Sequence, residues 1–180
     1  MAMDKPASHN LAMRGLFAAL AVLVLFLHLL PLDAQPNRWP FPDVLIALTF
    51  AWVLRRPDYV PTLLVAFVML MADLLLQRPP GLLAALVVFG SAYLRSAAPG
   101  MKDAGFVGEW MSVGVVITGV FLANRVILSI LSVQQAALWP VMIQLILTIA
   151  CYPAIVGLSQ SVFGVRRMSA SDASAVGGRA

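Results

Sequence analysis

Three ionisable side chains lie in apolar stretches of the chain, and chemistry within a membrane would depend on them: Asp73, Glu109 and Arg125. A charge inside a bilayer is costly unless it is paired or reaches the headgroups, so such residues mark structural ion pairs, binding sites or ion pathways. Counting from the ends of the predicted helices at 1.5 Å per residue puts Asp73 and Arg125 at similar depth, toward the outer side. Asn124 and Gln144 fall at comparable depth.

These positions predict an outward-facing polar cluster of Asp73, Asn124, Arg125 and Gln144, with Asp73 and Arg125 as an ion pair. The pair could serve only to lock two helices together, or Arg125 could reach the outer headgroups instead. A role in binding a partner helix or a small ligand is the alternative. Glu109 lies nearer the cytoplasmic side, where we expect it at the interface, paired with Lys102 or with an arginine of another loop.

Catalytic chemistry is not predicted. A membrane enzyme needs a nucleophile with its base, a metal cluster or paired carboxylates at working distance. The chain offers one cysteine, Cys151, and two histidines, His9 and His28, without the spacing of a metal site. There is no glycine-rich phosphate loop. We therefore predict no enzymatic activity, no metal and no cofactor.

The amino-acid composition is typical of a membrane protein. Of the 180 residues, 61% are hydrophobic and 11% charged, with a mean hydropathy of +0.91, whereas a globular domain is about half apolar and a quarter charged. The formal net charge of +4 is a modest surplus that does not imply nucleic acid. The fold class predicted is an all-α integral membrane protein.

Hydrophobic runs separated by turn signals predict six transmembrane helices. The first run follows basic residues as a signal peptide would, but the sequence before Ala34 lacks a small residue at the required position, so we interpret it as a helix. The domain organisation is a cytoplasmic N-terminal tail at 1–13, one six-helix domain at 14–167 and a disordered cytoplasmic tail at 168–180. The predicted helices are 15–32, 43–56, 59–76, 81–94, 106–131 and 138–165.

The basic residues predict the orientation. If six helices alternate, nine of the twelve Lys and Arg residues fall on one side and two on the other, with Arg125 inside a span. Basic residues accumulate on the cytoplasmic side of membrane proteins. Both termini are therefore expected in the cytoplasm, and an odd number of spans would remove the asymmetry.

The second predicted helix carries the most distinctive segment, which reads WPFPDVLIALTFAWVLRRPD from 39 to 58. Pro42 keeps its entry extended, and Asp43 can cap the helix start. At about 21 Å the helix is shorter than the hydrocarbon core of about 30 Å. Trp52 lies near its end, as in an aromatic belt, and Arg55 and Arg56 close it.

In this segment, through Pro42, Asp43, Trp52, Arg55 and Arg56, the chain resembles the rod shape-determining protein MreD family. The resemblance continues through 70–75, through 79–81 and to the arginine at position 95. It implies a non-catalytic membrane scaffold of the complex that elongates the cell wall of rod-shaped bacteria, in the inner membrane. The partners implied are MreC first, then MreB, a RodA-type glycosyltransferase and a class B penicillin-binding transpeptidase.

The MreD family is also similar to the substrate-capture subunits of energy-coupling-factor transporters, which have six helices and bind a ligand near the outer surface. That likeness implies a competing function, a small-molecule-binding subunit of a transporter. The outer polar cluster favours this alternative, whereas the lack of an Ala-xxx-Ala pattern in the first helix disfavours it.

Overall fold

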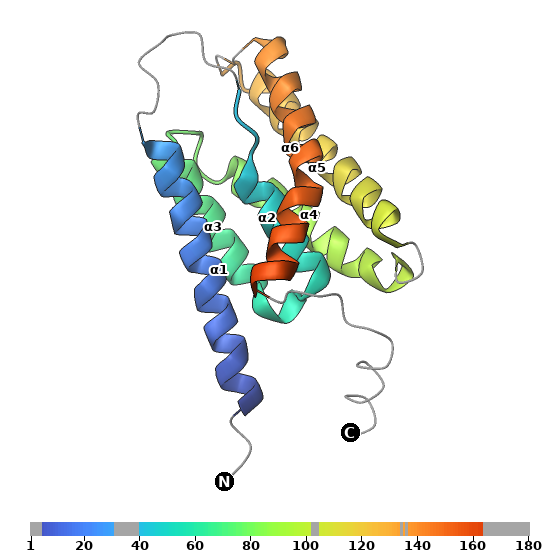
Figure 1. Ribbon diagram of the computed structural model, residues 1–180. Helices are drawn as coiled ribbons and strands as arrows, with labels where there is room; N and C mark the ends of the chain where they lie inside the picture. The colour runs from blue at the N-terminus through green and yellow to red at the C-terminus, as the bar shows by residue number, and fades with distance from the viewer. Residues whose placement is uncertain (1–4, 31–39, 102–104, 134, 136, 164–180) are drawn as a thin grey trace.

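The computed structural model describes residues 5–30, 40–101, 105–133, 135 and 137–163 (Figure 1). Within these ranges the chain forms six α-helices and two short 3-10 helices. In chain order they are α1 (Lys5–Leu29), α2 (Val44–Arg55), η1 (Pro57–Tyr59), α3 (Thr62–Leu75), α4 (Leu82–Ala97), η2 (Ala98–Met101), α5 (Gly105–Ile130) and α6 (Leu138–Phe163).

Four of the described helical stretches are long and apolar enough to cross a membrane: Ser8–Leu29, Leu82–Gly100, Gly105–Ile130 and Leu138–Val162. Helices α2 and α3 are apolar but shorter, with 12 and 14 residues. An α-helix rises 1.5 Å per residue, so each is about 18–21 Å long. The chain is thus an all-helical membrane protein, and the second helix is short, as the sequence predicted.

Helix α2 forms the centre of the bundle. Every residue of α2 after Val44 is buried, and α2 contacts α1, α4, α5 and α6. A helix that is apolar on all sides gains most when other helices cover all of it. The surrounding helices therefore turn one face toward α2 and leave large apolar side chains such as Leu23, Val115 and Ile146 exposed on the other.

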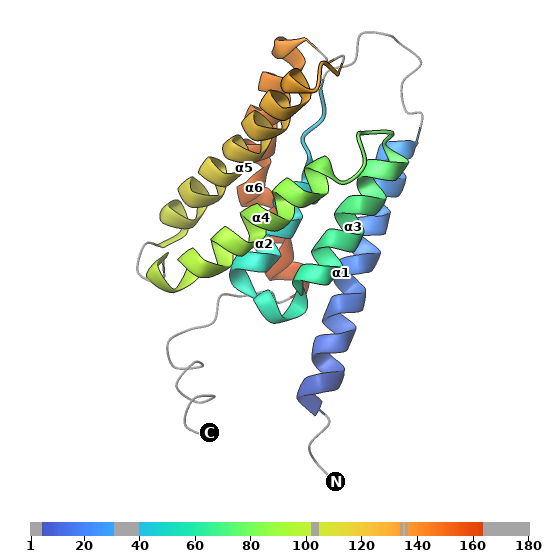
Figure 2. The same cartoon turned by 180° about the vertical axis from the view of Figure 1, so that it is seen from behind.

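The chain reverses so that α1 begins and α6 ends at the same end of the bundle (Figure 1). We call this the proximal end, and the opposite end, with the connections α3–α4 and α5–α6, the distal end. The first turns of α1 extend past the other helices at the proximal end (Figure 2). There Arg14 Nε donates to the Asp58 carbonyl oxygen at 3.1 Å, and His9 and Tyr59 are in contact.

Several predicted boundaries shift. Helix α1 begins at Lys5, about three turns before the apolar run at 15–32, because polar residues continue a helix once it has nucleated. Most of the predicted N-terminal tail at 1–13 is therefore helical. Helix α6 runs through Pro153. The predicted tail at 168–180 lies outside the described residues.

A close approach of three helices occurs at Gly90 of α4. A Cβ atom built there would lie 2.9 Å from Val116 Cγ1 of α5 and 3.0 Å from Phe50 Cζ of α2. Phe50 is fully buried, so its ring has no room to move aside. The absence of a side chain at position 90 lets α4 pack against both α2 and α5.

We expect Gly90→Ala to destabilise the bundle. Overpacking a tight contact costs about 1–3 kcal/mol, which exceeds the gain of about 1 kcal/mol in helix propensity. Gly119→Ala in α5 is the matched control, because its added Cβ meets no atom within 4 Å and only the gain remains. Thermal unfolding in detergent micelles measures both, and equal stability of the two variants would contradict the close approach.

Candidate functional site

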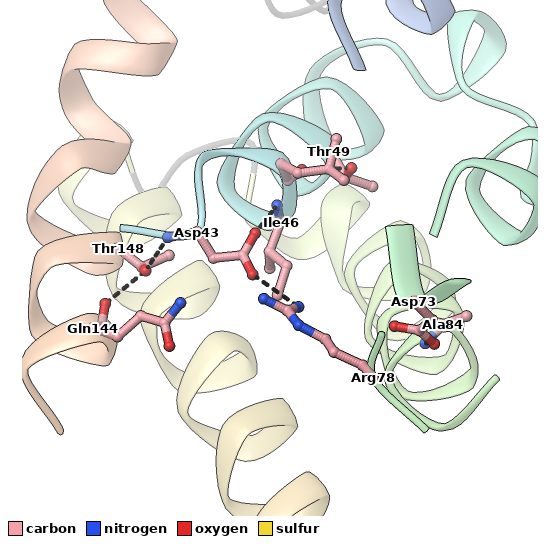
Figure 3. A network of polar contacts seen from close by, with 9 residues as sticks. Asp43, Ile46, Thr49, Asp73, Arg78, Ala84, Gln144 and Thr148 are labelled. Carbon is pink, nitrogen blue, oxygen red and sulfur yellow. Dashed lines mark hydrogen bonds and ion pairs between the residues drawn. The ribbon is translucent and has the colours of Figure 1, made fainter. Parts of the chain in front are cut away.

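Asp43 connects three parts of the bundle at the start of α2 (Figure 3). Its Oδ1 accepts a hydrogen bond from Ile46 N at 3.3 Å, which caps α2 as the sequence predicted. Its Oδ2 lies 3.4 Å from Arg78 Nη1 in the α3–α4 connection. Its own backbone N–H donates to Thr148 Oγ1 of α6 at 2.8 Å. Asp43 thereby fixes α2 against α6 and against the α3–α4 connection.

The local sequence explains this geometry. Proline has no N–H and holds its φ angle, so Pro42 favours an extended entry that leaves Asp43 as the first residue able to cap. Thr148 can accept from Asp43 because its hydroxyl donates to the Gln144 carbonyl oxygen, one turn earlier, at 2.7 Å. Thr148 lies ten residues into α6, about 15 Å along the helix. The entry to α2 is therefore deep within the bundle.

The predicted ion pair between Asp73 and Arg125 does not form. Asp73 is fully buried at the end of α3, and its Oδ2 accepts from Gly81 N at 3.1 Å and from Ala84 N at 3.2 Å. These are N–H groups of the first turn of α4, which have no partner within their own helix. Gly81 has a φ angle of +87°, which glycine adopts without strain. Asp73 thus caps α4, and depth along the helices alone did not reveal this.

The other predicted cluster residues line one cavity at the distal end, which we call the distal pocket. It has a volume of about 250 Å³ and lies between the starts of α2, α4 and α6 and the end of α5. Both polar and apolar side chains line it. The lining residues are Asp43, Arg78, Pro79, Leu83, Phe121, Asn124, Arg125, Leu128, Val133, Gln135, Val141 and Gln144.

The structure thus brings Asn124, Arg125 and Gln144 together, as predicted, and separates them from Asp73. Asp43 and Arg78 line the same pocket, which was not predicted. Arg78 is one of the two basic residues on the outer side in the predicted orientation. That position, on the same side as the predicted polar cluster, was the available signal.

A second polar site is closed and lies at the proximal end. Arg55 Nε and Nη2 donate to Glu109 Oε1 and Oε2 at 2.8 and 3.1 Å, and the Tyr152 hydroxyl donates to Glu109 Oε1 at 2.8 Å. The side chains of Arg55 and Glu109 are 4% and 1% exposed. Of the two partners predicted for Glu109, an arginine is the one found, and it comes from the end of α2. The pair is buried between helices. A bidentate pair of this kind satisfies two charges with little access to water.

The remaining residues of the segment serve the packing of α2. Trp52 is fully buried, packs on Phe17 with ring centroids 5.6 Å apart and donates from Nε1 to Ser159 Oγ at 3.1 Å. The expectation of an interfacial anchor is thus wrong for Trp52, because α1 and α6 cover it. Arg56 follows α2, and its guanidinium lies 5.8 Å from the centre of the Tyr59 ring.

Comparisons of the chain with protein-family models, with curated proteins and with solved structures gave no match. Nor do the residues that the structure describes include a group of three or more His, Cys, Asp or Glu side chains that could hold a metal ion. The arrangement itself offers two things: a closed ion pair that holds helices together, and an open pocket with cationic and amide groups.

Double-mutant cycles can test the polar contacts. We expect Asp43→Asn and Arg78→Gln to be coupled by about 0.5–1 kcal/mol, because their side chains touch in a partly buried setting. Asp73→Asn and Arg125→Gln should instead be additive within about 0.5 kcal/mol. Unfolding free energies in micelles give both values. Strong coupling of Asp73 to Arg125 would support the ion pair that the sequence predicted and would contradict the structure.

We expect the loss of one partner of the Arg55–Glu109 ion pair to lower the stability of the protein more than the loss of both partners. Glu109→Leu leaves the Arg55 charge buried without its carboxylate, which costs about 3–5 kcal/mol. Arg55→Met combined with Glu109→Leu removes both charges and should be more stable than Glu109→Leu alone. The same unfolding measurement applies, and a double variant that is less stable than the single one would contradict this account.

Proposed function

We propose that this chain is a non-catalytic scaffold of a bacterial cell-wall elongation complex, similar in role to MreD. In this proposal it lies in the inner membrane, crosses it six times and has both termini in the cytoplasm. Its direct partner is a protein of the MreC type. MreB, a RodA-type glycosyltransferase and a class B penicillin-binding transpeptidase belong to the larger complex, which supports peptidoglycan synthesis and cell shape.

The observation that carries this proposal is the burial of every residue of α2 after Val44, in the segment that bears the resemblance to MreD. Asp43, Trp52 and Arg55 of that segment all make contacts inside the bundle. The most distinctive part of the chain therefore serves to fix its own helices. A bundle held rigid in this way keeps its outer helix faces in a constant arrangement, which is what a binding platform for other membrane proteins requires.

The proposed topology is supported by two independent features. Nine basic residues fall on one side of the membrane when six helices alternate, against two on the other. The start of α1 and the end of α6 lie at the same end of the bundle (Figure 1), as an even number of crossings requires. Helices α2 and α3 are short for a span, and the extended segment before α2 supplies part of the missing length.

A second candidate function is favoured by the distal pocket. A small-molecule-binding subunit of a transporter would need a cavity with a few convergent polar groups, and Asn124, Arg125 and Gln144 supply such groups. Purification without added ligand, followed by mass spectrometry of the released molecules, separates the two functions. A stoichiometric soluble metabolite favours the capture subunit, and copurification of an MreC-type protein favours the scaffold.

Site-specific photocrosslinking tests the scaffold directly. A photoreactive residue is placed at an exposed position on each of four helices: Leu23 in α1, Leu63 in α3, Val115 in α5 and Ile146 in α6. We expect crosslinks to an MreC-type partner from one or two neighbouring helices, since a partner covers only one side of the bundle.

Val87 is the control position, because it is fully buried in α4 and contacts only this chain. Crosslinks from Val87 would indicate a disrupted fold and not a partner surface. If none of the four exposed positions reaches an MreC-type protein in cells that produce both, while copurification is also absent, the scaffold proposal is wrong.

A further inference from the structure

Positively charged side chains line the distal pocket inside a largely apolar bundle. Its lining includes two arginines, Arg78 and Arg125, and one carboxylate, Asp43. Both oxygens of Asp43 already accept hydrogen bonds from the protein, Oδ1 from Ile46 N and Oδ2 from Arg78. The carboxylate is thus engaged within the protein.

The other polar groups of the pocket are amides that can donate hydrogen bonds. Asn124 and Gln144 line the cavity from α5 and α6. Gln135, in the α5–α6 connection, donates from Nε2 to the Arg125 carbonyl oxygen at 3.2 Å, which ties the connection to the end of α5. A guanidinium has five N–H donors in a plane, so an arginine with one carboxylate partner keeps donors for a ligand. Donors of this kind, on several sides of one cavity, suit a group with several acceptor oxygens.

The cavity also has apolar lining residues: Leu83, Phe121, Leu128 and Val141. Those of α5 and α6 alternate with the polar ones along each helix. A bare inorganic ion would leave these apolar side chains in contact with water. A ligand that has both an anionic group and an apolar part contacts both kinds of side chain. The volume of about 250 Å³ limits the part inside the pocket to a headgroup or a small metabolite.

We propose that the distal pocket binds the phosphate group of an amphiphilic ligand. Arg125 and Arg78 contact the phosphate oxygens, Asn124 and Gln144 donate further hydrogen bonds, and the apolar side chains beside them, such as Phe121, contact the apolar part. Two sources share this chemistry, the headgroup of an anionic membrane lipid and a soluble phosphorylated metabolite. The inference depends on the pocket alone and holds whether the protein is a scaffold or a capture subunit.

Binding to the purified full-length chain in detergent tests the proposal by calorimetry. The probes are dihexanoyl phosphatidic acid for the lipid source, glycerol phosphate for the soluble source and dihexanoyl phosphatidylcholine as the neutral lipid. We expect one site per chain for an anionic probe and weaker binding of the neutral lipid. The tighter of the two anionic probes identifies the source.

Arg125→Gln should weaken binding about tenfold, since one charge-assisted contact is lost. Asn124→Asp keeps both arginines and the volume of the side chain, and it adds a negative charge that repels a phosphate, so it should weaken binding to a similar degree even if Arg125→Gln folds poorly. Arg14→Gln is the matched control, because Arg14 lies at the proximal end and contacts the Asp58 carbonyl oxygen. It should bind like the parent chain.

The proposal is overturned if neither anionic probe binds at millimolar concentration, or if Asn124→Asp binds as tightly as the parent chain. Equal loss of binding in Arg14→Gln would show a general effect of charge and would also overturn it. Copurification of an MreC-type partner is measured with the same variants. Retained partner binding with lost phosphate binding, or the reverse, separates this inference from the scaffold proposal.

Discussion

Helix α2 begins and ends inside the bundle, so each of its charged ends must be satisfied by other helices. At the start, Asp43 receives hydrogen bonds from Ile46 and Arg78 and donates its N–H to Thr148. At the end, Arg55 pairs with Glu109, which also accepts from Tyr152. An unpaired charge in these places would cost several kcal/mol. The positions of α5, α6 and the α3–α4 connection around α2 therefore follow from these two ends.

The two ends of α2 are satisfied in different ways. The proximal end is closed, because the side chains of Arg55 and Glu109 are almost fully buried and paired through two hydrogen bonds. Arg95 adds hydrogen bonds to Thr62 Oγ1 and to the Val60 carbonyl oxygen nearby, which hold the end of α4 to the start of α3. The distal end is open, since Asp43 and Arg78 border a cavity. One end thus fixes the bundle, and the other keeps polar groups accessible.

The outside of the bundle follows from the same constraint. Since the inner faces of its neighbours pack against α2, their outer faces present large apolar side chains, among them Leu23, Phe89 and Val115. In a membrane such side chains contact lipid or other transmembrane helices at little cost. The proposed scaffold function uses these faces, and the proposed phosphate site uses the distal pocket, so both can operate in the same molecule.

The sequence by itself determined the class of the protein, the six helices, the short second helix and its cap at Asp43, because hydropathy, turn residues and capping act over a few residues. It also indicated that Asn124, Arg125 and Gln144 lie at similar depth. Only the tertiary structure decided that Asp73 caps α4, that Arg55 pairs with Glu109 and that Trp52 is buried. Depth along a helix is set by sequence, but the direction of a side chain around the bundle depends on which helices are neighbours.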